Sequence, residues 1–226
     1  MNDSIDFGSI THLCFFGGTS LMADLINEVH HCFDISVVTS KRFLNNQTNF
    51  DKTFSAFLLD KNVSYLVTDT IDDSVESLIT PNTLGICISS NWIFTKKLIN
   101  QFKGRFINIH RSYLPFFRGC ASISWMFMQG NFESGYSFHL MTPSIDAGPI
   151  LASGKLYYTK EIPSMGEAYI KLEKKIVEEF KIFITAIKER KVLKLENQNE
   201  EMSTYFPRLN QKIHAYIDWM WSAEDI

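Results

Sequence analysis

An asparagine and a histidine separated by one residue, Asn108 and His110, are the first side chains whose types and spacing suggest chemistry. They stand at the end of an expected strand, where alternation turns side chains two positions apart to one face. An amide N–H beside an imidazole can hydrogen-bond a carbonyl oxygen, and binds more strongly the oxyanion that forms when that carbonyl is attacked. The alternative is a pair of satisfied polar residues at a strand end, because a lone Asn-x-His is a weak signal.

A carboxylate, Asp146, follows in the segment Ser-Ile-Asp-Ala-Gly-Pro-Ile. The turn expected at Gly148-Pro149 would present this carboxylate to a cleft, although an Asx-turn residue fits the same pattern. Close to His110, Asp146 would favour the protonated imidazole and fix its orientation, as in an acid–base pair. The sequence has neither Gly-x-Ser-x-Gly nor His-Glu-x-x-His, so serine and zinc hydrolysis lack their residues and no metal is expected.

Alternating strands and helices must position these residues. Short apolar runs alternate with segments of helical periodicity and predict a Rossmann-like α/β fold, a mostly parallel sheet with helices on both faces. The expected strands are 12–16, 35–39, 64–69, 84–90 and 105–110. Sites in such sheets lie beyond the carboxyl ends of the strands, where Asn108 and His110 stand.

The second half of the chain departs from simple alternation. We expect strands at 136–142 and 150–159, the second with a bulge at Gly154. A long amphipathic helix is predicted from Ser164 to Glu189, opened by a loose capping box. Residues 191–226 are polar with aromatic patches and predict a C-terminal strand and aromatic tail appended to a main domain at 1–190.

Composition narrows the function classes. The formal net charge of −3 does not support nonspecific binding to nucleic acid. The N-terminus lacks the positive charge of a signal peptide, and no window is long and apolar enough to span a membrane, so we expect neither export nor membrane association. The cysteines, four in number, are scattered, which favours reduced thiols and the cytoplasm. The 19 phenylalanines predict a core rich in rings.

An ordered set of motifs surrounds the candidate residues, and together they are more specific than any one alone. The set comprises Asn108, His110, Leu114, Pro115, Arg118, Gly119, Trp125, Gly135, His139, Asp146, Gly148 and Ile150. It resembles the central signature of the folate-dependent formyltransferases. The resemblance implies transfer of a formyl group from N10-formyltetrahydrofolate to an amine, with Asn108, His110 and Asp146 as the catalytic triad of a domain at 1–190.

The resemblance also implies where the pterin ring of the folate would bind. In the family this pocket lies between the loop that follows the strand before Asn-x-His and the loop that carries the aspartate. The corresponding cofactor-binding residues here are Ser90, Asn91, Trp92, Ile93, Ile145 and Gly148.

Family branches with different amine acceptors remain open. Methionyl-tRNA formyltransferases carry a further C-terminal domain for which this chain has no room, and the acidic balance also disfavours tRNA. Glycinamide ribonucleotide formyltransferases have a phosphate loop near the N-terminus, and Gly17, Gly18 and Thr19 occupy that place. Glycines at a strand-to-helix turn equally serve packing. A formyltetrahydrofolate hydrolase, in which water replaces the amine, and a binding protein without catalysis are further alternatives.

The C-terminal tail favours a third branch. Its Tyr-Phe-Pro-Arg and Ile-Asp-Trp motifs resemble the ends of nucleotide-sugar N-formyltransferases, which modify amino sugars for surface polysaccharides such as lipopolysaccharide. The resemblance implies base stacking by Tyr216, Trp219 or Trp221 and diphosphate binding by Arg118 or Arg208, although these aromatic residues equally fit a role as anchors of the tail. A small nucleotide sugar is the expected partner. The sequence leaves open whether the chain is truncated at Ile226 and whether the protein forms a homodimer.

Overall fold

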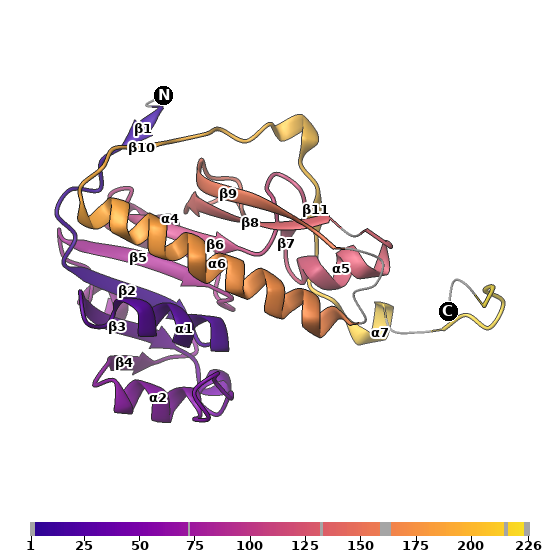
Figure 1. Cartoon of the computed structure of the whole chain (residues 1–226), viewed down its shortest axis with the longest axis horizontal. Coiled ribbons are helices and arrows are strands. Elements are labelled where there is room, and N and C mark those ends of the chain that lie inside the picture. The colour runs from indigo at the N-terminus through magenta and orange to yellow at the C-terminus, as the bar shows by residue number, and fades with distance from the viewer. Residues whose placement is uncertain (1–2, 72, 132, 159–163, 215–216, 224–226) are drawn as a thin grey trace.

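The computed structural model describes the chain except for residues 1–2, 72, 132, 159–163, 215–216 and 224–226. Its centre is a seven-stranded sheet in the order β4-β3-β2-β5-β6-β8-β9 (Figure 1). The strands are β2 (His12–Gly17), β3 (Asp34–Thr39), β4 (Ser64–Val67), β5 (Thr83–Ile88), β6 (Phe106–His110), β8 (Glu133–Leu140) and β9 (Ile150–Tyr157). Neighbours from β4 to β6 pair in parallel, whereas β8 and β9 add an antiparallel edge. The predicted α/β class is confirmed.

Helices cover both faces of the sheet, because alternate side chains of each strand point to opposite sides. Leu13 and Phe15 of β2 belong to the apolar cluster that includes the inner residues of α1, α2 and α6. Cys14 and Phe16 of the same strand belong to a second cluster with α4. The helices are α1 (Ser20–Val29), α2 (Phe54–Asp60), α3 (Asp73–Glu76), α4 (Lys96–Gln101), α5 (Ser122–Met128) and α6 (Met165–Lys188).

The core is rich in phenylalanine, as predicted. The largest fully buried side chains include Phe15, Phe16, Phe102, Phe106 and Phe138. Phe102 and Phe106 stack with ring centroids 4.5 Å apart, and Phe16 meets the Phe106 ring at 5.2 Å. These rings pack between α4 and the sheet, and Phe106, the first residue of β6, anchors the amino end of that strand.

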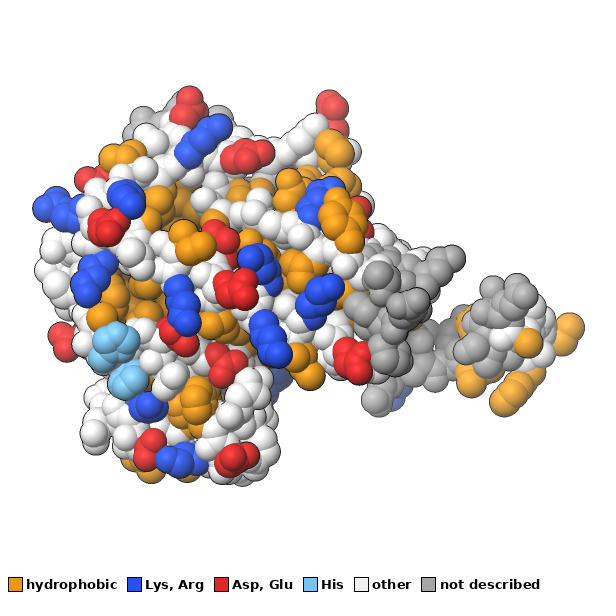
Figure 2. Space-filling model, viewed as in Figure 1, with side chains coloured by type: hydrophobic (Ala, Val, Ile, Leu, Met, Phe, Trp, Pro, Cys, Tyr) orange, Lys and Arg blue, Asp and Glu red, His pale blue; other side chains and the backbone are white. Residues whose placement is uncertain are grey.

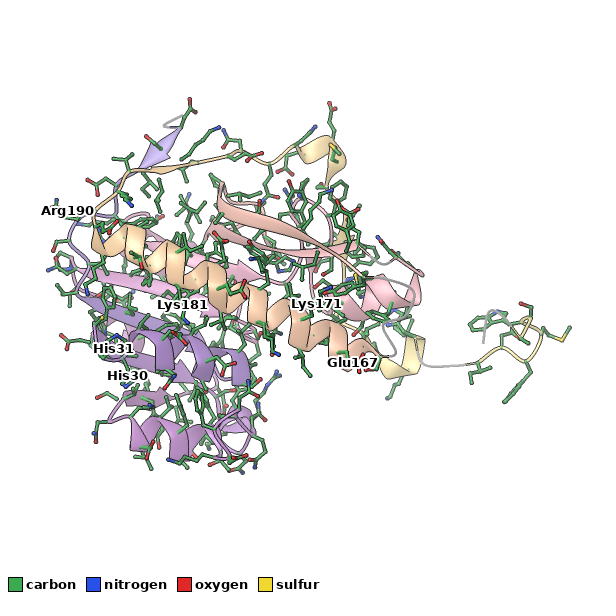
Figure 3. The ribbon with its side chains drawn as sticks, viewed as in Figure 1. His30, His31, Glu167, Lys171, Lys181 and Arg190 are labelled. Carbon is green, nitrogen blue, oxygen red and sulfur yellow. The ribbon has the colours of Figure 1, made fainter. Side chains whose placement is uncertain are left out.

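The long helix α6 crosses one face of the sheet (Figure 1). The Ser164 side chain accepts a hydrogen bond from the Glu167 N–H, so the expected cap is present. Leu172, Ile176 and Phe180 are buried on its inner face, and Figure 3 labels Lys171 and Lys181 along the same helix, where both side chains are exposed. The apolar stripe therefore binds α6 to the sheet and its charges face water.

After α6 the chain contributes short strands to two places. β10 (Leu193–Lys194) pairs with β1 (Ser4–Ile5), and β11 (Tyr205–Phe206) pairs with β7 (Arg118–Gly119). A 3-10 turn, η2 (Glu200–Met202), lies between them, and α7 (Gln211–His214) follows. Residues 217–223 then project away from the body of the protein (Figures 1 and 2).

The expected bulge at Gly154 is wrong. The irregularity in the β8–β9 ladder lies between Phe138 and His139, and Gly154 pairs regularly with Tyr136. A Cβ at Gly154 would meet the Tyr136 ring, so packing of that ring accounts for the glycine. No helix in the part of the chain that the structure describes has the length and apolar composition to cross a membrane.

Candidate active site

Asn108 and His110 lie on β6, near the middle of the sheet. In the sheet register Asn108 pairs with Cys87 of β5 on one side and with His139 of β8 on the other. The His110 ring is buried, with 8% of the residue exposed. The parallel-to-antiparallel transition at β6 therefore brings three strands together around the Asn-x-His motif.

The Asp146 carboxylate completes this group from the loop between β8 and β9. Its Oδ1 accepts a hydrogen bond from Asn108 Nδ2 over 3.0 Å, and its Oδ2 accepts one from the Gly119 N–H over 2.8 Å. Oδ2 also lies 3.6 Å from His110 Nδ1. Burial alone would raise the pKa of Asp146, but His110, His139 and the Gly119 N–H together hold that pKa below its usual range. The structure thus brings the three predicted side chains together around an ionised carboxylate.

Opposing effects act on the pKa of His110, whose ring was expected to be charged beside Asp146. Burial lowers the pKa of His110, and this effect outweighs the opposing influence of Asp146 and of the Phe117 carbonyl. His110 Nε2 lies 2.8 Å from the Phe117 oxygen, which assigns the proton of the neutral ring to Nε2. Nδ1 is then the unprotonated nitrogen and faces Asp146. The ring is arranged to accept a proton at Nδ1, where the carboxylate would stabilise the resulting charge.

A second histidine, His139, joins the group. It is 1% exposed, and its Nδ1 lies 3.0 Å from the Leu140 carbonyl oxygen, to which it donates when protonated. Its Nε2 lies 3.1 Å from Asn108 Nδ2 and 3.4 Å from Asp146 Oδ1. With its proton on Nδ1, His139 accepts from Asn108, so both N–H groups of the Asn108 amide are engaged. The motif contained His139, but sequence reasoning assigned it no role.

Backbone strain is concentrated around these side chains. Ser89, Phe117, Ala121 and Asp146 have φ angles of 51°, 56°, 58° and 50°, in the left-handed region that non-glycine residues rarely adopt. Such conformations persist only where the surrounding structure holds them, and they cluster at functional sites. The positions of Asp146 and of the Phe117 carbonyl that contacts His110 are therefore imposed by the fold.

A cavity of about 600 Å³ opens beside the group, within the range of small-molecule sites. Asn108, His110 and Asp146 line it, as does Asn91, whose buried side-chain oxygen has no partner among the described residues. A buried acceptor without a partner is costly unless a ligand satisfies it. The cavity therefore has the volume and an unused polar group suited to a polar ring system.

Five of the six residues predicted to bind the folate line this cavity. They are Ser90, Asn91, Trp92, Ile93 and Ile145. The sixth, Gly148, is not among the lining residues. A Cβ at Gly148 would overlap the Leu140 carbonyl oxygen, so the close approach of two backbone segments requires this glycine. Packing beside Asp146 accounts for Gly148, and its folate role stays a prediction.

The N-terminal glycine turn is not among the residues that line the cavity. A Cβ at Gly17 would overlap the Ile88 carbonyl oxygen, and one at Gly18 would overlap the Phe43 side chain. Thr19 precedes α1 with no side-chain cap bond. Packing accounts for both glycines, and a phosphate loop at 17–19 stays a prediction.

Arg118 does not have the free guanidinium predicted for a diphosphate ligand. The residue is 7% exposed, and its donors bind Gln198 Oε1 and the Glu200 carboxylate at 2.7 to 3.1 Å. Every guanidinium nitrogen is therefore engaged within the chain. The substrate-binding role of Arg118 is corrected to an internal one.

The other residues predicted to bind the substrate, Arg208, Trp219 and Tyr216, differ in their position relative to the cavity. Arg208 lines the cavity, as do Arg42 and Tyr205, which sequence reasoning missed. Arg42 follows the carboxyl end of β3, so the strand-end rule was the signal that could have found it. Trp219 is 82% exposed on the projecting tail, and Tyr216 lies outside the described residues.

A family model described as formyl transferase matches residues 20–185, more than half of the chain. The chain therefore belongs to the formyl transferase family. A methionyl-tRNA formyltransferase from Clostridium perfringens is 33% identical over 141 residues, which is 62% of this chain and 45% of that protein. The chain thus spans less than half the length of this curated relative.

Solved structures share the fold over nearly the whole chain. An N-formyltransferase from Helicobacter canadensis, solved with folinic acid and dTDP-3-aminofucose, has a TM-score of 0.76 at 17% identity and covers 96% of this chain and 78% of its own. A 4-N formyltransferase from Francisella tularensis has a TM-score of 0.74 at 21% identity, covering 96% and 84%. At these identities the likeness establishes the fold.

Proposed function

We propose that this protein transfers the formyl group of N10-formyltetrahydrofolate to the amino group of a nucleotide-linked amino sugar. One observation carries the proposal: Asn108, His110 and Asp146 meet within hydrogen-bonding or ion-pair distance and line a cavity of about 600 Å³. An amide donor, a neutral imidazole and an ionised carboxylate are the groups that acyl transfer to an amine requires.

The loop at 89–93 fits the pterin part of the donor. Asn91 offers a buried oxygen without a partner, and a pterin amino or ring N–H would satisfy it. Trp92 and Ile93 supply apolar surface on the same loop, and Ile145 faces the cavity from the loop that carries Asp146. When bound, the folate supplies the formyl carbon and the nitrogen that leaves.

His110 accepts the proton of the attacking amine, and Asp146 stabilises the charge that results. His110 is neutral with Nδ1 free, so it accepts the amine proton there. The protonated ring gains a charge-assisted interaction with Asp146, whose Oδ2 lies 3.6 Å away. The same proton is then available for return to the departing nitrogen.

Asn108 stabilises the oxyanion once one of its N–H groups is released. One binds Asp146 Oδ1 and the other lies against His139 Nε2. Release of the N–H that faces His139 Nε2 would make it available to the oxyanion. His139 therefore has a positioning role in this proposal.

Further residues that line the cavity support an anionic, aromatic acceptor. Arg42 and Arg208 both line it, and guanidinium groups bind phosphate oxygens in a fork geometry. Tyr205 offers a ring for stacking against a base. The presence of dTDP-3-aminofucose in the related Helicobacter structure agrees with this acceptor class. A role in surface-polysaccharide synthesis in the cytoplasm belongs to the same proposal.

The experiment combines the protein with formyl donor and a panel of dTDP-, UDP- and GDP-linked amino sugars. Formylated sugar nucleotide, detected by mass, supports the proposal. Initiator methionyl-tRNA is included because the curated relatives carry that name, and glycinamide ribonucleotide tests the 17–19 loop. Formate release without an acceptor would instead identify a hydrolase.

A further inference from the structure

We propose that Arg118 and Gln198 form a positioning device that holds Asp146 in its reactive geometry. The inference rests on the function proposed above and adds a residue from outside the stretch that matches the family model, which ends at residue 185. Neither residue lies among those that line the cavity. They would act on the reaction through Asp146 alone.

Gln198 holds the backbone on both sides of the turn that carries Asp146. Its Nε2 donates to the Asp146 carbonyl oxygen over 2.8 Å and to the Gly148 carbonyl oxygen over 2.7 Å. Its Oε1 accepts from Arg118 Nε at 3.1 Å and from Arg118 Nη2 at 2.7 Å. Every hydrogen of the amide and its oxygen are used, so the network fixes the orientation of the side chain.

Arg118 anchors Gln198 in turn. The buried guanidinium forms a bidentate ion pair with the Glu200 carboxylate. Nη1 lies 2.8 Å from Oε2, and Nη2 lies 2.8 Å from Oε1. Gly119, the next residue, donates its N–H to Asp146 Oδ2. One short strand therefore supports Asp146 twice, directly through Gly119 and through the Arg118–Gln198 pair.

Asp146 needs such support because its backbone is strained. Its φ of 50° is unfavourable for a residue with a side chain and persists only where neighbours impose it. The carboxylate must also stay 3.0 Å from Asn108 Nδ2 and face His110 at 3.6 Å. Displacement of a catalytic group by about 1 Å can cost about 100-fold in rate. Two hydrogen bonds to the carbonyls around Asp146 oppose that displacement.

Substitution at Gln198 tests the device. Gln198→Leu removes all four contacts of the amide with little change in volume. Gln198→Glu keeps the acceptor for Arg118 but sets an oxygen against the Asp146 and Gly148 carbonyls. Asn199→Ala is the matched control, because the side chain of this exposed neighbour accepts from the Glu201 N–H in its own turn rather than from Arg118 or Gln198. Thermal unfolding of each variant identifies any that fail to fold.

Two measurements are made on each folded variant. We expect both Gln198 variants to lose about 10- to 100-fold in kcat while KM for donor and acceptor stays within about 2-fold, and Asn199→Ala to match the wild type. NMR titration of labelled histidines is the second measurement. Because Asp146 raises the pKa of His110, a displaced carboxylate lowers the His110 titration midpoint in the Gln198 variants.

The outcomes separate this inference from the proposed function. Wild-type His110 titration or wild-type kcat in Gln198→Glu would overturn the device, as would an equal loss in Asn199→Ala. If the wild-type protein transfers no formyl group, the proposed function fails, but the histidine titration still decides whether Gln198 holds Asp146.

Discussion

Asn108 donates a hydrogen bond from Nδ2 to Asp146 Oδ1 over 3.0 Å, although 38 residues separate the two along the chain. The bond joins the end of β6 to the loop after β8. It sets the orientation of the carboxylate, whose other oxygen then faces His110 Nδ1. An amide, an imidazole and a carboxylate are thereby fixed relative to one another before any substrate binds, which is the preorganisation that catalysis needs.

The pH dependence of the reaction tests the roles of His110 and Asp146. A neutral His110 must accept the amine proton, so kcat/KM should fall as pH drops through the pKa of His110, which burial sets below the ordinary value of 6.5. Asp146 opposes that lowering. In Asp146→Asn the acid limb should therefore move to still lower pH while the plateau falls by about 10²–10⁴-fold. An acid limb that stays in place, or moves upward, in the variant would contradict this assignment.

Gly148→Ala should reduce both stability and activity. An alanine Cβ would overlap the Leu140 carbonyl oxygen, so the loop carrying Asp146 must shift. We expect the free energy of unfolding to fall by about 1–3 kcal/mol, the usual cost of overpacking. Gly166→Ala is the control, because a Cβ there meets only Ser164 Oγ at 3.7 Å in the first turn of α6. Chemical denaturation compares the two, and equal stabilities would argue against the packing role.

Arg42 and Arg208 should determine affinity for the acceptor. A charge-assisted hydrogen bond is worth about 1.5–3 kcal/mol, so Arg42→Ala or Arg208→Ala should raise KM for the nucleotide sugar about 10- to 100-fold with little change in kcat. Arg190→Ala, an exposed position after α6 labelled in Figure 3, is the control. Steady-state kinetics with each substrate varied in turn gives the answer. A larger effect on KM for the formyl donor would place these arginines at the folate tail instead.

Trp219→Ala should leave the kinetics of the isolated chain unchanged. The side chain is 82% exposed, and the tail that carries it projects from the body (Figure 2). The sequence-based expectation of base stacking predicts a raised KM for the nucleotide sugar. A selective rise in that KM, measured by steady-state kinetics, would restore the stacking role and contradict the position seen here.

Strong local patterns account for the parts of the fold that sequence predicted. The apolar run at 12–16 and the capping serine before α6 fix their elements through neighbours in the chain. The strands β10 and β11 contain two residues each and are held by partners at Ser4–Ile5 and Arg118–Gly119. Such short elements carry no periodicity, so the path of the chain after α6 could not be predicted.

Only the site residues that belong to recognisable motifs could be predicted from the sequence. Asn108, His110 and Asp146 were assigned through the ordered set of motifs and its resemblance to the folate-dependent formyltransferases, whereas the burial that lowers the pKa of His110 follows from no local pattern. Arg118 was predicted to bind diphosphate, but in the structure its guanidinium bonds other residues of the chain. Its actual partners, Gln198 and Glu200, lie 80 and 82 residues away in a segment without a recognisable motif.

Single-turnover transfer of a labelled formyl group, with the protein in excess over the labelled donor, tests the central claim most directly. Wild-type protein and the variants Asn108→Ala and His110→Ala are compared, with His31→Ala, an exposed histidine after α1, as the control. The account predicts a loss of about 10²–10³-fold in the transfer rate for Asn108→Ala, the scale for removal of an oxyanion donor, a comparable loss for His110→Ala and none for His31→Ala. Transfer by either site variant at the wild-type rate would contradict it.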